Sequence, residues 1–467
     1  MPLGETSSNT TVQYTVTTTN TADGTTLYWK TTGNVSNSDI VGGNTGSIVV
    51  TNNRAIFNVT IFTDTLTEGV ETIGIAISTG SLNGPTVVST ANLITINDTS
   101  LDPAPERLYS WGQNDNGQLG QNNRIASGGR SSPVQVGTDT TWDQISTQEF
   151  AVIATKTNGT LWSWGSGNGG GLGLNNTVDR SSPTQVGALT TWSKVVKAKY
   201  FTLAIKTDGT LWSFGKNGQG QLGLGDVINR SSPVQVGSAT NWSLISAGNY
   251  MASAIKTDGT LWMWGQQVQG SFGLNESGNV YKSSPTQVGS GTTWSQVSSG
   301  PYSWMATQTN GTLWLCGYNN YGHLGFNDTV DKSSPVQLGA GTDWSKISHG
   351  FNSSLATKTN GTLWAWGRNH KGQLGRNIAY TTNSSSPVQV GSSTTWSLID
   401  TDSGTVLATK TDGTLWVWGT QQSGVLGLNA IVGSYTDGRS SPIQVGAATT
   451  WSKISTGGFM SIAITSG

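Results

Sequence analysis

Hydrophobic and polar residues alternate in short runs along most of this chain. In the segment that begins at Trp242, three such runs cover 242–246, 252–257 and 260–265. Alternation with a period of two places successive side chains on opposite faces of an extended chain, so each run predicts a β-strand. Asp258-Gly259 separates the second run from the third, and Asp-Gly between two strands indicates a hairpin with a type I′ turn. Pro285 suits the start of a fourth, outer strand, because proline lacks the N–H that a central strand needs.

This unit of three or four strands recurs seven times, and the phrase of its third run returns at intervals of 50 to 53 residues. A Trp opens the copies at Trp142, Trp192, Trp242, Trp294, Trp344, Trp396 and Trp451. The phrase Leu-Trp-x-Trp-Gly, or a near match, begins at Leu108, Leu161, Leu211, Leu261, Leu313, Leu363 and Leu415. The phrase Ser-Ser-Pro-x-Gln-(Val/Leu)-Gly begins at Ser131, Ser181, Ser231, Ser283, Ser333, Ser385 and Ser440. One supersecondary unit repeated at this period predicts an array of stacked β-sheets.

The last copy is cut short, and its missing piece stands before the first copy. The copy that begins at Trp451 ends at Gly467, where Leu-Trp-x-Trp-Gly should follow, and Leu108 opens such a phrase with no hairpin before it. We therefore expect the N-terminal phrase to complete the last sheet. Four-stranded antiparallel units arranged in this way form a β-propeller, whereas an open array would carry polar capping repeats. The expected fold is all-β, with a seven-bladed β-propeller closed by its N-terminal strand.

The recurring phrases resemble the regulator-of-chromosome-condensation repeat. The resemblance rests on Leu-Trp-x-Trp-Gly, a Gly-x-Leu-Gly loop such as Gly117-Gln-Leu-Gly120, and Ser-Ser-Pro-x-Gln-Val. It covers about residues 107–467 in all copies and implies a seven-bladed propeller, but the fold alone implies no function. Family members that exchange guanine nucleotides carry a long wedge insertion, and chromatin-binding members carry a basic tail. Neither feature is visible here, so nucleotide exchange is not expected.

The first 100 residues do not share this period. Alternating runs predict a β-sandwich of about seven strands, with runs at 12–16, 26–29, 47–50, 55–61, 72–77 and 91–96. The segments 64–72 and 96–98 resemble a Calx-β-like module, a type found in bacterial adhesion proteins and in virion proteins of tailed phages. The expected domains are a sandwich at 1–100, a stiff linker at 101–106 and the propeller at 107–467.

The Calx-β-like resemblance makes calcium the one candidate cofactor. Members of that family can bind Ca²⁺ through clustered carboxylates, and the candidates here are Asp39, Asp64, Glu68, Glu71 and Asp98. Ca²⁺ takes about six to eight oxygen ligands, and the acidic terminal run typical of the family is reduced here to Asn97-Asp98. The alternative interpretation is that these carboxylates only flank surface turns.

Composition excludes several classes of function. Only 10% of the residues are charged, the formal net charge is −1, and no basic tract is present. Nucleic acid is therefore not an expected partner, because clustered Lys and Arg supply most of the affinity for phosphates. No window approaches the ~18 apolar residues of a membrane-spanning helix, and residues 1–25 show no ordinary secretory signal. The single cysteine, Cys316, excludes an intrachain disulfide and is expected to be a small core residue.

The sequence shows no constellation that supports catalysis. The three histidines, His323, His349 and His370, are each expected in surface loops. No Cys/His spacing fits a metal site, and no Gly-x-Ser-x-Gly nucleophile motif is present. The Gly-rich loops lack the strand-to-helix context of a phosphate cradle. We therefore expect a protein that is not an enzyme.

Aromatic residues recur at one position, in the turn between the first and second strands of each unit. Five of the seven aligned residues are aromatic, and the set reads Phe150, Tyr200, Tyr250, Tyr302, Asn352, Gly404 and Phe459. If the first strand is innermost, as in the resembling family, these residues surround one mouth of the central channel. Stacking aromatics would suit sugars or a polypeptide there. The alternative is that they only pack one blade against the next near the axis.

Two further features repeat or vary in an informative way. The loops after Gly-x-Leu-Gly vary while their surroundings repeat, most visibly at 121–130, 275–282, 376–384 and 428–439. Variable polar loops on a constant scaffold are typical of a recognition surface, although unconstrained drift between copies gives the same pattern. A repeated lysine, at Lys156, Lys206, Lys256, Lys358 and Lys410, is interpreted as a solvated hairpin edge.

The expected function is that of a non-enzymatic structural and recognition protein. By resemblance to low-charge, two-module chains, it is similar to a tailed-phage virion component, a fibre or surface decoration. Its expected partners are other virion proteins or a protein or glycan of the host surface, and its expected location is the virion. The alternative is a secreted or cell-surface bacterial adhesin, and a guanine-nucleotide exchange regulator is a third class.

Overall fold

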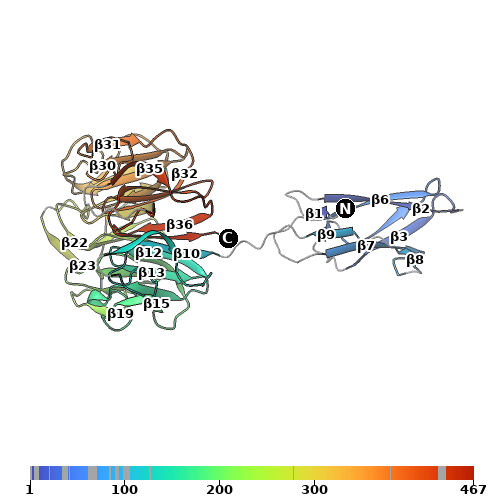
Figure 1. Cartoon of the computed structure of the whole chain (residues 1–467), viewed down its shortest axis with the longest axis horizontal. Coiled ribbons are helices and arrows are strands. Elements are labelled where there is room, and N and C mark those ends of the chain that lie inside the picture. The colour runs from blue at the N-terminus through green and yellow to red at the C-terminus, as the bar shows by residue number, and fades with distance from the viewer. Residues whose placement is uncertain are drawn as a thin grey trace. The chain divides into compact units, whose positions relative to one another are not determined.

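The computed structural model divides the chain into two compact units, Met1–Ala104 and Pro105–Gly467 (Figure 1). It describes the whole chain except residues 1–2, 5–9, 20, 34–39, 42, 62–70, 84–85, 90–93, 98–105, 126–127, 277, 379, 430–437 and 467. Of the expected linker at 101–106, only Glu106 is among the described residues. Every regular element is a strand except one short 3₁₀ helix, η1 (Asn168–Gly170), within the described residues.

The first unit consists of two β-sheets. The six-stranded sheet contains β1 (Leu3–Gly4), β9 (Ile94–Asn97), β7 (Glu71–Thr79), β3 (Thr26–Gly33) and β5 (Thr45–Val49) in this order, with β8 (Thr86–Ser89) paired to β7. The three-stranded sheet has the order β2 (Thr10–Thr17), β6 (Arg54–Ile61) and β4 (Ile40–Val41). The six alternating runs of the sequence thus overlap β2, β3, β5, β6, β7 and β9.

One hydrophobic core joins these two sheets. Ile73, Ile75 and Ile77 of β7 are buried in it together with Val59 of β6. Across the sheets, the ring of Trp29 in β3 stacks on Phe57 in β6 with centroids 4.8 Å apart. Buried aromatic pairs of this kind add stability beyond the area that they bury.

The second unit is built of repeated four-stranded antiparallel sheets, seven of them among the described residues. The first strands are β12 (Trp142–Gln148), β16 (Trp192–Lys197), β20 (Trp242–Ala247), β24 (Trp294–Ser299), β28 (Trp344–His349), β32 (Trp396–Asp402) and β36 (Trp451–Thr456). The second strands are β13 (Ala151–Lys156), β17 (Phe201–Lys206), β21 (Met251–Lys256), β25 (Ser303–Gln308), β29 (Ser353–Lys358), β33 (Thr405–Lys410) and β37 (Met460–Thr465).

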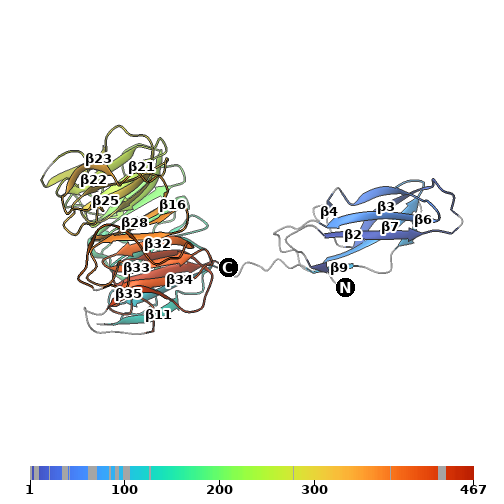
Figure 2. The ribbon, with the colours of Figure 1, turned by 90° about the horizontal axis from the view of Figure 1, so that it is seen from above.

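The third and fourth strands complete each sheet on its outer side. The third strands are β14 (Leu161–Gly165), β18 (Leu211–Gly215), β22 (Leu261–Gln267), β26 (Leu313–Gly317), β30 (Leu363–Gly367), β34 (Leu415–Thr420) and β10 (Arg107–Gln113). The fourth strands are β15 (Arg180–Gln185), β19 (Arg230–Gln235), β23 (Val280–Gln287), β27 (Lys332–Gln337), β31 (Ser384–Gln389), β35 (Gly438–Gln444) and β11 (Gly129–Gln135). Figure 2 shows one such sheet, with β32, β33, β34 and β35 side by side in chain order.

The first strands contact one another in a closed cycle. Each lies against the first strand of the next sheet, and the cycle returns from β36 to β12. A side chain at one repeated position accepts a hydrogen bond from the backbone N–H of the neighbouring first strand. The pairs are Ser146–Lys197, Ser246–Ser299, Ser298–His349, Ser348–Thr401, Asp400–Thr456 and Ser455–Thr147, at 2.7–3.1 Å. The aligned residue between β16 and β20 is Val196, which has no acceptor in its side chain.

The last sheet takes strands from both ends of the unit. Its order is β11, β10, β37 and β36, so the strand that begins at Arg107 pairs with the strand that ends at Thr465. In Figure 1 β36 and the C-terminus lie beside β10 and β12. The expectation that the N-terminal phrase completes the last sheet is met by six paired positions, from Arg107 with Thr465 to Gly112 with Met460.

The hairpin between the second and third strands differs from the expected turn. Only its glycine has a positive φ, for example +75° at Gly209, whereas a type I′ turn needs positive φ at both central residues. Gly209 N donates to Lys206 O and Lys206 N donates to Thr210 O, which makes a three-residue loop with a bulge. The side chain of Asp208 caps the loop, because its Oδ1 accepts hydrogen bonds from Thr210 N and Thr210 Oγ1. The type I′ prediction is therefore wrong.

Tryptophans fill the space between consecutive sheets. The second Trp of the phrase Leu-Trp-x-Trp-Gly is buried, and its ring packs near the Trp that opens the same sheet, as Trp366 does with Trp344 at 6.1 Å. Its indole N–H crosses to the Gly-x-Leu-Gly loop of the preceding sheet. The donor and acceptor pairs are Trp111–Val425, Trp164–Gln118, Trp264–Gln221, Trp366–His323 and Trp418–Gln373, at 2.7–3.0 Å.

One sheet exchanges the large and the small residue of this arrangement. Cys316 stands where five other sheets have the second Trp and one has Phe214. Its partner across β25 and β26 is Trp304, where other sheets have a smaller residue. Both side chains are fully buried, as expected for Cys316. The Trp304 ring lies 6.1 Å from Trp294, the same separation as between Trp366 and Trp344. The ring of Trp304 therefore fills from the second strand the space that the third strand fills elsewhere.

The repeated lysines do more than form a solvated edge. Each ammonium group lies over the rings of two tryptophans of its own sheet, at 3.6–5.1 Å from their centroids. Lys206 Nζ, for example, is 3.6 Å from the ring of Trp212 and 5.0 Å from that of Trp192. The lysine stems thus cover aromatic surface at the hairpin end of the sheets, and the cation is stabilised by the ring faces.

Candidate functional site

The turns and loops that the sequence singles out lie on one face of the second unit. In every sheet, the second strand begins opposite the end of the third strand, as Ala151 pairs with Gly165. The turn between the first and second strands and the loop after the third strand are therefore at the same end of the sheet. The hairpins with the lysines are at the opposite end. The recurring aromatic turns and the variable loops thus share a face.

Seven equivalent positions form a ring on this face, which we call the mouth. At each position the backbone carbonyl accepts a hydrogen bond from the residue that follows the glycine of the third-strand phrase, at 2.8–3.0 Å. The acceptor and donor pairs are Phe150–Ser166, Tyr200–Lys216, Tyr250–Gln266, Tyr302–Tyr318, Asn352–Arg368, Gly404–Thr420 and Phe459–Gln113. The sequence alignment of the seven positions is thus matched by one shared backbone geometry.

The five aromatic side chains of the mouth are half-buried, and four of them contact one another in two pairs. The rings of Tyr200 and Tyr250 lie 5.2 Å apart, and those of Phe150 and Phe459 lie 6.4 Å apart. Burial raises the pKa of Tyr250 to about 12, with further contributions from its hydrogen bond to Tyr200 and from nearby Tyr302. The structure therefore brings all five predicted aromatics to one ring, where they both pack between sheets and present an edge to solvent.

A charged pair lies beside these aromatics. Lys199 Nζ is 2.9 Å from Glu149 Oε2, and it lies 5.5 Å from the centroid of the Tyr200 ring. Lys216 lies over the same ring at 4.6 Å. This side of the mouth therefore combines aromatic faces with both signs of charge.

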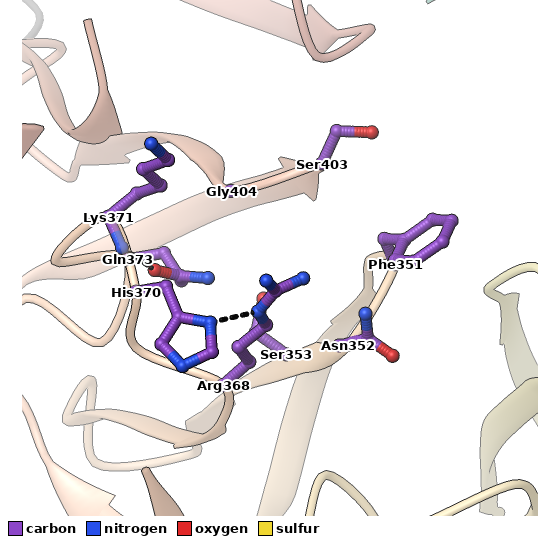
Figure 3. A pocket seen from close by; sticks show the side chains of 9 residues that line it. All are labelled: Phe351, Asn352, Ser353, Arg368, His370, Lys371, Gln373, Ser403 and Gly404. Atoms are coloured by element: carbon purple, nitrogen blue, oxygen red, sulfur yellow. Dashed lines mark hydrogen bonds between the residues drawn. The ribbon is translucent and has the colours of Figure 1, made fainter. Parts of the chain in front are cut away.

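The two positions without an aromatic residue open a cavity of about 250 Å³. It lies between the sheets that begin with β28 and β32, and Figure 3 shows the side chains around it. Asn352 and Gly404 occupy the mouth positions, and a larger side chain at either would enter this space. The remaining lining residues are Phe351, Ser353, Arg368, His370, Lys371, Gln373 and Ser403. Among these residues, the repeat pattern indicates only Asn352 and Gly404, as the two gaps in the aromatic series.

Comparison with protein families identifies the repeats. The model described as the regulator of chromosome condensation (RCC1) repeat matches residues 106–147, 158–205, 208–255, 310–357 and 360–401, and a second RCC1 repeat model matches 344–373. The second unit contains RCC1 repeats. The segments that these models leave out, such as 258–309, have the same four-stranded arrangement.

Solved structures with the same fold include RCC1 proteins. A chain from the crystal structure of Kap60 bound to yeast RCC1 (Prp20) has a TM-score of 0.68 at 16% identity, covering 78% of this chain and 89% of that one. Human WBSCR16 has a TM-score of 0.67 at 18% identity, covering 77% of this chain and 98% of its own. Prp20p from Saccharomyces cerevisiae has a TM-score of 0.67 at 16% identity, with coverages of 77% and 91%. At these identities the likeness concerns the RCC1-like propeller fold alone. No curated protein sequence matches the chain.

Two of the three histidines are not in surface loops, and that prediction is wrong. His323 has 0% of its surface exposed and His349 has 4%, because the RCC1 repeats place both between two sheets. His349 Nε2 lies 2.7 Å from Ser303 Oγ, and His323 Nε2 lies 3.1 Å from the same hydroxyl. Burial lowers the pKa of His323 to about 4 and holds the pKa of His349 well below its usual value. Both imidazoles are therefore neutral at pH 7.

Most of the candidate calcium ligands lie outside the residues that the structure describes. Asp39, Asp64, Glu68 and Asp98 lie outside the described residues, and Glu71 is the first residue of β7. Among the residues that are described, no group of three or more His, Cys, Asp and Glu is placed to hold a metal ion. The described part also contains no helix with the length and apolar character that a membrane crossing requires.

Two carboxylates of β32 are held near the axis of the RCC1 repeats. Asp400 Oδ2 accepts from Thr456 N at 2.7 Å, and burial raises the pKa of Asp400 to about 6. Burial also raises the pKa of Asp402 to about 7, and the nearby charge of Glu149 adds to this increase. Both side chains remain partly exposed.

We expect Asp402→Asn to stabilise the protein at pH 8 by about 2 kcal/mol and to have little effect at pH 4. A carboxyl whose pKa is raised in the folded state stabilises that state at low pH, and this contribution is lost as the pH rises toward 7. The amide side chain does not ionise, so the variant keeps this stability at pH 8. His323 and His349 oppose this trend in the parent protein, but they cancel in the difference between variant and parent. Urea unfolding at both pH values measures that difference, and an equal difference at both would contradict the assignment.

Proposed function

We propose that this chain is a non-enzymatic structural and recognition protein that binds a surface ligand with the mouth face of its RCC1-repeat unit. The proposal rests on one observation: the half-buried aromatic turns and the variable loops share one face of a scaffold that is otherwise constant. A rigid frame that carries variable loops is the usual design of a recognition surface. Exposed aromatic edges beside Lys199 and Lys216 suit a glycan or a polypeptide.

The finer architecture is part of the same proposal. We take the seven four-stranded sheets to be the blades of one closed propeller, fastened where β10 joins β37. The cyclic contacts of the first strands and the six hydrogen-bonded pairs between them support this arrangement. The two sheets that share a core in the first unit support a β-sandwich of the Calx-β-like type, with calcium as a candidate ligand of that module.

The setting that we propose is the virion of a tailed phage, as a fibre or surface decoration. The support is the resemblance of both modules and the low charge of the chain, and the expected partners are neighbouring virion proteins or a host surface protein or glycan. The alternative is a secreted or cell-surface bacterial adhesin, which uses the same recognition face. Electron microscopy and mass spectrometry of purified particles separate the two, since an adhesin is absent from every particle fraction.

We expect Tyr200→Ala and Tyr250→Ala each to weaken binding of the ligand by about tenfold, because each removes a stacking surface at the mouth. A glycan array and a cell-surface binding screen on the full chain identify the ligand and measure the loss. Tyr28→Ala is the matched control, because Tyr28 is a half-buried tyrosine of β3 in the first unit. Equal binding by the parent and both mouth variants would remove the mouth as the binding surface.

A nucleotide-exchange role has one specific reason to be tested. Prp20p, which shares the RCC1-like fold, is described by its binding to Gsp1p and histones. The repeats here keep intervals of 50 to 55 residues and leave no room for a wedge insertion. We therefore expect no acceleration of nucleotide release from a small GTPase.

A further inference from the structure

We propose that the cavity between Asn352 and Gly404 binds the carboxylate of an acidic sugar residue, with Arg368 as its main contact. This inference deepens the proposed recognition function and rests on it. The cavity belongs to the mouth, where the recognition face is expected to meet its ligand. What distinguishes it from the rest of the mouth is a pair of cations that face an open space.

The absence of an aromatic residue at Asn352 leaves Arg368 without the partner that its aligned residues have. In two other repeats, the residue after the third-strand glycine lies against the mouth aromatic of its own sheet. Lys216 lies 4.6 Å from the centroid of the Tyr200 ring, and Tyr318 lies 6.4 Å from that of Tyr302. Arg368 has Asn352 in that place, so its guanidinium lines the cavity.

Arg368 is held in position from two sides. Its guanidinium carbon lies 4.9 Å from the centroid of Tyr321, which belongs to the loop of the preceding repeat. Its Nε donates to His370 Nδ1, the hydrogen bond drawn in Figure 3. Burial and the neighbouring cations lower the pKa of His370, so the imidazole is neutral at pH 7 and accepts this bond. A guanidinium fixed through its Nε and one face offers its two terminal NH₂ groups to a ligand.

The charge of the cavity is not balanced by the protein. The eight ion pairs formed by the described residues include neither Arg368 nor Lys371. No carboxylate is among the residues that line the cavity. Asp402 is close in sequence, but its side chain interacts with Ser403, Gln148 and Glu149. The cavity therefore favours an anion, and the planar fork of Arg matches a carboxylate.

Size and lining indicate a sugar acid and not a bare anion. A volume of about 250 Å³ is below the ~300–1,000 Å³ of pockets for drug-sized ligands, so it suits a group of about one sugar ring. The ring of Phe351, 40% exposed, forms an apolar wall on one side in Figure 3. The amides of Asn352 and Gln373 and the hydroxyls of Ser353 and Ser403 supply partners for sugar hydroxyls. Inorganic phosphate would use the cations and leave the rest of this lining without a role.

The experiment measures binding to the full chain by saturation-transfer NMR and calorimetry. The probes are the methyl glycosides of glucuronic acid and N-acetylneuraminic acid, methyl glucoside as the neutral counterpart, and inorganic phosphate. We expect an acidic glycoside to bind at least tenfold more tightly than the glucoside and than phosphate, with an affinity that falls as salt rises. Phosphate binding as tight as the best glycoside, or no binding of either acidic glycoside, would overturn the proposal.

Three variants locate the binding. Arg368→Gln is expected to weaken the acidic glycoside about 10- to 100-fold, since it removes a charge-assisted bidentate contact. Asn352→Tyr is expected to abolish binding, because it places in the cavity the side chain that other repeats have. Lys332→Gln removes a cation at the start of the outer strand β27, at the same end of the sheets, and is the matched control, expected to change affinity less than twofold. Equal losses in Arg368→Gln and Lys332→Gln would overturn the proposal, because they would indicate only a general charge effect.

The outcomes separate this inference from the proposed function. Loss of glycan binding in Tyr200→Ala with no loss in Arg368→Gln leaves the recognition function standing and removes the acidic-sugar site. Thermal unfolding of Arg368→Gln controls for folding. If that variant is unstable, Arg368→Lys keeps the charge and removes the fork, and it is expected to weaken the acidic glycoside at least fivefold.

Discussion

Replacing both members of the exchanged pair at once, Trp304→Val with Cys316→Trp, is expected to leave stability within about 1 kcal/mol of the parent protein. Each single substitution is expected to be costly. Trp304→Val empties a fully buried site and should cost about 3–5 kcal/mol, and Cys316→Trp places a second large ring in filled space and should cost about 1–3 kcal/mol or more. The double variant copies the pair Val152 and Trp164 of another sheet.

The physical reason is that both arrangements fill the same space. The ring of Trp304 lies as far from Trp294 as that of Trp366 lies from Trp344. The double variant also gains a hydrogen bond, because Trp304 Nε1 is buried without a partner while the equivalent indoles donate to the preceding sheet. Urea unfolding of the four proteins gives the coupling energy. Additive losses in the double variant would show that the two positions do not share one space.

The features that follow from local chemistry and from the period could be predicted from the sequence. The Asn-Gly and Asp-Gly dipeptides predict the hairpins between the second and third strands correctly, although the predicted type of turn is wrong. The dipeptides have two physical explanations, a positive φ at both residues or a side-chain cap, and the sequence does not separate them. The last copy lacks its third and fourth strands, and the first phrase supplies them. Matching the strands of each copy in order therefore predicts the pairing of β10 with β37.

Features that depend on contact between neighbouring sheets were missed. His323 and His349 stand at repeat positions that hold Gln, Ser or Thr in most other copies, so their polarity indicates a surface. Their shared hydrogen-bond partner, Ser303, comes from another strand. The Trp304 and Cys316 pair did leave a signal, since the hairpin at Asn310-Gly311 fixes their register. Trp304 is a large residue where other sheets have a smaller one, and it pairs with Cys316, where the usual Trp is absent.

Only part of the candidate site could be predicted from the sequence. The alignment showed five aromatics and two gaps, and the structure places all seven positions in one ring. That the gaps at Asn352 and Gly404 adjoin Arg368, His370 and Lys371 could not be inferred, because these residues belong to a loop that meets the gap only through sheet packing. An interruption in a repeated series of residues can thus indicate where a site lies. The residues that line the site cannot be predicted from the repeat period.

Removing β36 and β37, by ending the chain at Thr450, is expected to abolish the cooperative unfolding transition of the second unit. The deletion removes Met460, Ile462 and Ile464, which are fully buried. At about 1.5–3 kcal/mol for each large apolar side chain, their loss alone approaches the roughly 5–15 kcal/mol that stabilises a typical protein. It also exposes Leu108 and Trp111 of β10, which have no exposed surface in the intact protein.

The same deletion distinguishes a closed ring of sheets from an open array of sheets. In an open array each repeat contacts only its neighbours, so loss of the last repeat costs one interface and leaves the others folded. In a ring the deletion takes away the neighbour of both β12 and β32, and it leaves β10 and β11 as half a sheet with an unpaired edge. Calorimetry of the truncated chain makes the distinction, with deletion of Ser466-Gly467 as the control that leaves every strand intact. A peptide of residues 448–467 added in trans should restore the transition in a ring, whereas an unchanged transition without the peptide would indicate an open array.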